Sequence, residues 1–103
     1  MECLDTGWVS SSGRFVNLFE YKIASYTGAK FAIACSSATS ALFISLKILG
    51  VRRDEEVIVP TLTFIAPVNT IKYLGAEPVF MDSDEFCNID VNKTIEFLSL
   101  IHI

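Results

Sequence analysis

The stretch "CSSATSALFISLKILG", residues 35–50, places four hydroxyl-bearing side chains at the start of an otherwise apolar segment. These are Ser36, Ser37, Thr39 and Ser40, and the segment closes at Gly50. The apolar residues that follow recur at the three- and four-residue spacing of a helix face, which predicts a helix with a polar first turn. Two interpretations of that polarity are open. It could be a helix cap worth about 1 kcal/mol, or a site for an anion on the free N–H groups of the first turn.

Strands and helices are expected to alternate on both sides of this segment. Strands are predicted over 29–35, 57–59 and 76–82, with Pro60 ending the second. Helices are predicted over 13–28, over 38–49, around Pro67 up to Gly75, and after the capping residue Asp90. This alternation indicates parallel strands joined by crossover connections, and hence an open α/β sheet covered on both faces.

Two polar loops are expected at the carboxyl edge of that sheet, where open α/β folds bind their ligands. The first is "SSATS", residues 36–40, and the second is "PTLTF", residues 60–64. The first loop lacks the glycines and lysine of a P-loop and the glycines of a dinucleotide-binding motif. Without further information, Phe64 is interpreted as a core aromatic, because large aromatic side chains dominate protein cores.

A second candidate site is the pair Asp82 and Asp84, one residue apart after a predicted strand. Paired aspartates of this kind hold metal ions in haloacid-dehalogenase phosphatases and in many glycosyltransferases. Phe86 stands where the phosphatase pattern has Thr or Val, and we expect no metal here. The alternative is a solvated turn in which the aspartate side chains bond the local backbone.

Composition excludes several classes of protein. The chain has 103 residues, enough for one domain, and its net charge of −4 offers no basic patch for nucleic acid. No apolar run is long enough to cross a membrane and the first residues do not form a signal peptide, so we expect a cytoplasmic protein. Cys3, Cys35 and Cys87 are expected to be free packing residues, and no role is assigned to His102.

The chain resembles a known family nearly from end to end. The segments that carry the resemblance are "DTGWVSSSGRFVNLFE", "SYTGAKFAIACSSATSAL", "LGVRRDEEVIVPTLTFIAPVNTIKYLGAEPVFMD" and "NID". They resemble the pyridoxal-phosphate-dependent sugar aminotransferases of the DegT/DnrJ/StrS family. The resemblance implies that residues 1–103 are part of the cofactor-binding large domain of a fold-type-I transferase, a three-layer α/β/α sandwich, without the small C-terminal domain.

The resemblance also implies roles for individual residues. Ser37, Ala38 and Thr39 would bind the phosphate of pyridoxal phosphate, and Phe64 would lie over its pyridine ring. Trp8, in the "GWVSSSG" opening, is a candidate substrate contact. The resemblance places the catalytic Schiff-base lysine of the family beyond the position of Ile103. None of the five lysines of this chain stands in a matching motif: Lys22, Lys30, Lys47, Lys72 and Lys93.

The implied reaction is the amination of a nucleotide-linked keto sugar for a bacterial surface polysaccharide. The implied partners are the nucleotide sugar, an amino-acid donor (glutamate) and, at full length, a second copy of the chain in a homodimer. We expect the chain as given to be inactive alone, as a truncated first part of the enzyme. Two alternatives are a non-catalytic α/β remnant and a small phosphate- or metal-binding domain built on Ser37, Thr39, Asp82 and Asp84.

Overall fold

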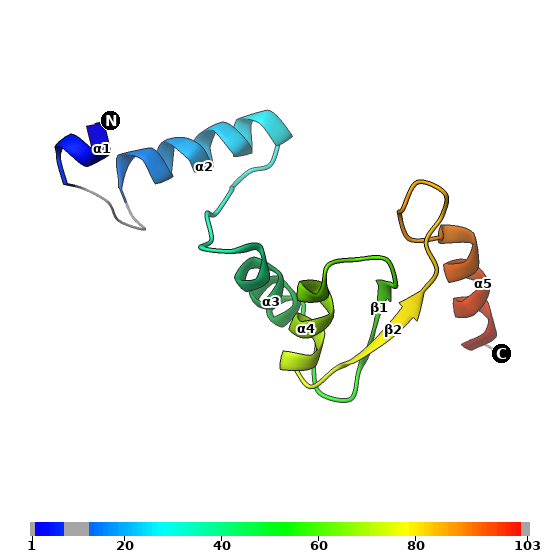
Figure 1. Ribbon diagram of the computed structural model, residues 1–103. Helices are drawn as coiled ribbons and strands as arrows, with labels where there is room; N and C mark the ends of the chain where they lie inside the picture. The colour runs from blue at the N-terminus through cyan, green and yellow to red at the C-terminus, as the bar shows by residue number, and fades with distance from the viewer. Residues whose placement is uncertain (1, 8–12, 102–103) are drawn as a thin grey trace. The chain divides into compact units, whose positions relative to one another are not determined.

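The fold is described from a computed structural model, which covers residues 2–7 and 13–101. The chain divides into two compact units, residues 1–37 and residues 38–103. The first unit contains α1 (Glu2–Asp5) and α2 (Arg14–Thr27). The second contains α3 (Ala38–Ile48), β1 (Glu56–Pro60), α4 (Ile65–Tyr73), β2 (Glu77–Met81) and α5 (Val91–Ile101) (Figure 1).

The second unit is organised around a parallel strand pair. β1 and β2 pair in parallel with Ile58 opposite Val79, and α4 connects them along the chain. α4 packs against both strands, and α3 packs against α4. In Figure 1, α5 lies on the other side of the two strands from α3 and α4. The predicted strands over 57–59 and 76–82 are therefore confirmed, and their parallel direction is confirmed with them.

The core of this unit lies between the strands and α4. Val59, Ile71 and Ala76 are buried together, and four partly buried side chains pack around them: Leu46, Val51, Val57 and Val68. Thr70 is also fully buried, and its hydroxyl donates to the Pro67 carbonyl at 2.7 Å, so its burial leaves no hydroxyl unsatisfied.

Local signals in the sequence fix the ends of the helices. α2 ends at Gly28, which has the left-handed conformation (φ 72°) that ends many helices. α5 begins after Asp90, whose side chain accepts the Lys93 backbone N–H at 3.1 Å in the expected capping geometry. The predicted helices over 13–28 and 38–49 are confirmed to within two residues at their ends. The helix predicted with Pro67 in its first turn and an end at Gly75 is confirmed as α4, and the helix predicted after Asp90 is confirmed as α5.

The predicted strand over 29–35 is wrong. These residues have no regular secondary structure, and among the described residues no strand pairs with them. Phe31 and Ile33 are exposed by 75% and 83%, so the predicted burial is wrong as well. An apolar run indicates that a segment tends to be buried, but a strand also needs a neighbouring strand for its backbone groups. The described residues of the first unit form helices and no strand.

No helix among the described residues is long and apolar enough to cross a membrane.

Candidate functional site

The first turn of α3 holds the candidate anion-binding residues. The helix begins at Ala38, with Thr39 as its second residue, and Ser37 immediately precedes it. Backbone N–H groups in the first turn of a helix have no partner within the helix, and the helix dipole places partial positive charge there. Ala38 is exposed and Thr39 is half-buried, so a ligand can reach this turn from solvent.

An open hollow of about 320 Å³ lies beside this turn. Thr39, Ser40 and Phe43 line it from α3, and Tyr73 lines it from the end of α4. The Lys47 ammonium lies 6.0 Å from the centre of the Phe43 ring. Neither Phe43 nor Tyr73 is predicted as a site residue from the sequence. Phe43 lies one helical turn after Thr39 on α3, a spacing that can be read from the sequence, whereas the packing of α3 against α4 brings Tyr73 there.

Phe64 is the residue before α4 and has an extended backbone conformation (φ −61°, ψ 148°). Its side chain is 85% exposed, so the interpretation of this residue as a core aromatic is wrong. Because the ring is not covered by protein, one face is available to a planar ligand. Phe64 is not among the residues that line the hollow at Thr39.

Asp84 closes a tight turn over residues 83–89. Its Oδ1 accepts the backbone N–H groups of Phe86 at 2.9 Å and Asn88 at 2.8 Å. Ser83 and Ile89 form an isolated antiparallel bridge at the base of the turn. This is the arrangement expected of an aspartate that bonds the local backbone.

Asp82 has a different role from Asp84. Its Oδ2 pairs with the Lys93 ammonium at 2.6 Å, and its carbonyl accepts the Asp90 N–H at 2.9 Å. The hydrogen bond and the charge of Lys93 lower the pKa of the Asp82 carboxyl, and the same two effects of Asp82 raise the pKa of Lys93. Among the described residues, no group of three or more His, Cys, Asp or Glu side chains could hold a metal ion.

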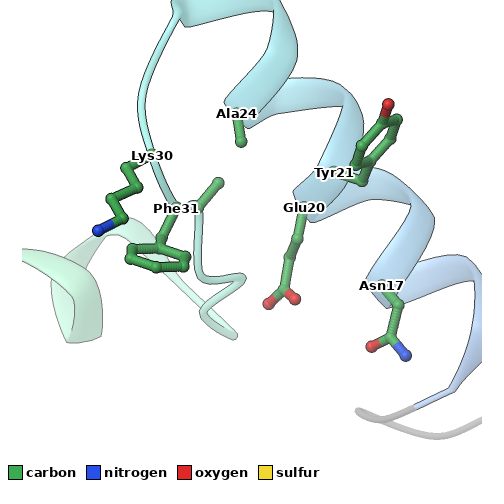
Figure 2. A pocket seen from close by; sticks show the side chains of 7 residues that line it. Asn17, Glu20, Tyr21, Ala24, Lys30 and Phe31 are labelled. Atoms are coloured by element: carbon green, nitrogen blue, oxygen red, sulfur yellow. The ribbon is translucent and has the colours of Figure 1, made fainter.

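A second hollow, of about 240 Å³, lies within the first unit between α2 and residues 30–32 (Figure 2). Glu20 points into it from α2, and its carboxylate accepts the Ala34 backbone N–H at 2.7 Å. The Lys30 ammonium lies 5.4 Å from the centre of the Phe31 ring. Glu20 therefore accepts a hydrogen bond from the Ala34 N–H, a backbone group that pairs with no described strand.

Further predictions from the sequence concern the tryptophan, the histidine and the cysteines. Trp8 and His102 lie outside the described residues, as does the side chain of Cys3. Cys35 and Cys87 are free thiols, as expected, but both are exposed, so their predicted packing role is wrong.

The model of the DegT/DnrJ/EryC1/StrS aminotransferase family matches residues 1–98 of the chain. The chain belongs to this family. GDP-perosamine synthase of Caulobacter vibrioides is 48% identical over 94 residues, which cover 90% of this chain and 25% of that enzyme. GDP-perosamine synthase of Escherichia coli O157:H7 is 51% identical over 83 residues, which cover 81% of this chain and 23% of that enzyme.

A solved structure also matches the fold of this chain. It is a Streptococcus pneumoniae protein assigned as a sugar aminotransferase, in its PLP form, with a TM-score of 0.81 and 30% identity. The match covers 92% of this chain and 24% of that chain. The chain therefore spans about a quarter of the length of these relatives, and its two parallel strands and their helices match part of a sugar aminotransferase.

Proposed function

We propose that this chain supplies the phosphate and ring contacts for pyridoxal phosphate in an enzyme that aminates a nucleotide-linked keto sugar. In this proposal, residues 1–103 belong to the large domain, a three-layer α/β/α sandwich, of a cytoplasmic homodimer. The enzyme would have the full length of its relatives, and it is called the full-length form below. The amino donor would be glutamate, and the product would serve the synthesis of a bacterial surface polysaccharide.

The observation that carries the proposal is the solvent-accessible first turn of α3, in a chain whose residues 1–98 match the aminotransferase family. Ser37, Ala38 and Thr39 would hold the phosphate through backbone N–H groups and hydroxyls, at the end of the helix that favours negative charge. The similar Streptococcus pneumoniae structure is in its PLP form, which supports this choice of anion.

Phe64 suits the role proposed for it. Its ring is exposed by 85%, and it lies immediately before α4, in the loop of residues 61–64 that follows the carboxyl end of β1. Ligands of parallel α/β sheets bind at that edge. Stacking on the pyridine ring would orient the cofactor and keep water from one of its faces.

The chemistry is divided between the cofactor and the protein. When bound, pyridoxal phosphate supplies the electron sink that lets an amino group pass between an amino acid and a keto carbon. The residues of this chain bind and orient it. The lysine that carries the covalent link and moves the proton would come from the remainder of the full-length form.

The reaction is tested by supplying the full-length form with pyridoxal phosphate, ¹⁵N-labelled glutamate and a GDP-linked 4-keto-6-deoxy sugar. We expect a GDP-linked amino sugar that carries the label, detected by mass spectrometry. The two GDP-perosamine synthases among the relatives motivate this choice of sugar. Absence of labelled product with every nucleotide-linked keto sugar supplied would contradict the proposed function.

A further inference from the structure

The loop that carries Phe64 is tied down at its first residue. Thr61 follows β1 directly, and its backbone N–H donates to the Met81 carbonyl at 2.8 Å. The Thr61 hydroxyl donates to the same carbonyl at 3.0 Å. Met81 is the last residue of β2 and is 8% exposed, so the acceptor belongs to the packed part of the unit.

We propose that the Thr61 hydroxyl is a positioning group that holds residues 61–64 in the conformation in which Phe64 can stack on the cofactor. This inference rests on the proposed function, because it assigns Thr61 a role through Phe64. It adds a residue that the resemblance to the family did not assign.

The geometry favours a positioning role for three reasons. Pro60 has no backbone N–H, so it cannot donate a hydrogen bond to β2, and the next backbone donor along the chain is the Thr61 N–H. The bond from the hydroxyl then fixes the Thr61 side chain as well as its backbone. Only Leu62 and Thr63 separate this anchor from Phe64, so little backbone freedom remains between the fixed strand end and the start of α4.

The expected effect follows from the population of the binding conformation. If the loop adopts that conformation only part of the time, the apparent affinity for the cofactor falls by the same fraction. One net hydrogen bond changes such an equilibrium by about two- to tenfold. Thr61→Val removes the hydroxyl but keeps the shape of the side chain and the backbone bond. It should therefore weaken pyridoxal phosphate binding by about two- to tenfold, and Thr61→Ser should restore it.

The test is a double-mutant cycle in the full-length form, with the affinity for pyridoxal phosphate measured by spectroscopic titration. If Thr61 acts through Phe64, Thr61→Val should weaken binding in the wild-type background and have no further effect in a Phe64→Ala background. Thr94→Val is the matched control. The Thr94 hydroxyl donates to the Asp90 carbonyl at 2.7 Å in α5, so this variant loses a bond of the same kind away from Phe64 and should leave affinity unchanged.

Each outcome separates this inference from the proposed function. Phe64→Ala binding the cofactor as tightly as wild type would contradict the stacking role, and the inference with it. Phe64→Ala weakening binding while Thr61→Val does not would overturn the inference alone. Additive losses in the double variant would overturn it as well. If Thr61→Val and Thr61→Ala both lack a melting transition, Thr61 is needed for folding and the positioning role is overturned.

Discussion

Thr39 and Phe64 are the two residues on which the proposed cofactor site depends. They come from different parts of the second unit: Thr39 from the first turn of α3, and Phe64 from the residue before α4. One offers a hydroxyl and an N–H to an anion, and the other offers an uncovered aromatic face. Their roles can be separated experimentally, because a hydrogen bond to a charged oxygen and a stacking contact respond to different substitutions.

Thr39→Val in the full-length form should weaken pyridoxal phosphate binding by about 1.5 to 3 kcal/mol, the usual loss for one hydrogen bond to a charged group. Thr39→Ser keeps the hydroxyl and should bind nearly as tightly as wild type. Equilibrium titration measures both. Unchanged affinity in Thr39→Val would show that this hydroxyl does not contact the phosphate.

Phe64→Ala should weaken cofactor binding by about 1 kcal/mol for the lost stacking. The free energy of burying the ring against the cofactor is lost in addition. Because the side chain is 85% exposed, thermal stability without cofactor should change little. The control is Phe86→Ala, which removes an aromatic of similar exposure (75%) from the turn at residues 83–89. A large drop in melting temperature with unchanged cofactor affinity would indicate a packing role instead.

At the level of secondary structure, the sequence correctly predicted the helix ends that depend on the preferences of single residues. Gly28 and Asp90 mark helix ends through their own backbone and side-chain preferences, and both were correct. The strand over 29–35 was wrong because pairing depends on a partner elsewhere in the chain. The exposure of Phe64 was also missed from the residue alone, since an aromatic side chain does not reveal whether it faces the core or a ligand.

The turn after β2 should not bind metal ions. The Asp84 side chain already accepts two backbone N–H groups, and Asp82 is paired with Lys93. A ligand that binds only the native state raises its stability. Magnesium, manganese or calcium should therefore leave the melting temperature unchanged. A clear rise that Asp82→Asn abolishes would restore the metal-site hypothesis.

The ion pair between Asp82 and Lys93 should contribute to stability within a defined pH range. The pKa of Asp82 is lowered from 3.8, so its contribution is present above that value and is lost as the pH falls through the lowered pKa. The pKa of Lys93 is raised from 10.5, so its contribution is present below that value and is lost as the pH rises through the raised pKa.

Asp82→Asn should therefore lower the melting temperature slightly at neutral pH, and the difference from wild type should vanish in acid. The effect is small because both groups are exposed to solvent. Glu85→Gln removes the same charge from the turn at residues 83–89, three residues from Asp82, and serves as the control. Equal pH dependence in the two variants would mean that net charge, not the ion pair with Lys93, causes the effect.

For the whole molecule, the balance between buried and exposed apolar surface is unusual. Few described side chains are buried, whereas many large apolar ones are exposed, including Ile95, Leu100 and Ile101 on α5. A two-stranded sheet also leaves both of its edges unpaired among the described residues. Exposed apolar surface and unpaired strand edges promote association.

The chain as given should therefore associate, and the full-length form should not aggregate. Size-exclusion chromatography with light scattering compares the two at equal concentration. We expect polydisperse assemblies of the chain as given and a defined dimer of the full-length form. A monodisperse monomer of the chain as given, with a cooperative melting transition, would contradict this expectation.

The central claim is that this chain contacts pyridoxal phosphate while the lysine that binds it covalently lies elsewhere in the full-length form. The most direct test is to add pyridoxal phosphate to the full-length form, reduce with borohydride, digest, and locate the adduct by mass spectrometry. We predict one stoichiometric adduct per chain, on a lysine outside residues 1–103, with only scattered labelling of exposed lysines within them. A stoichiometric adduct on Lys22, Lys30, Lys47, Lys72 or Lys93, or no stoichiometric adduct at all, would contradict the claim.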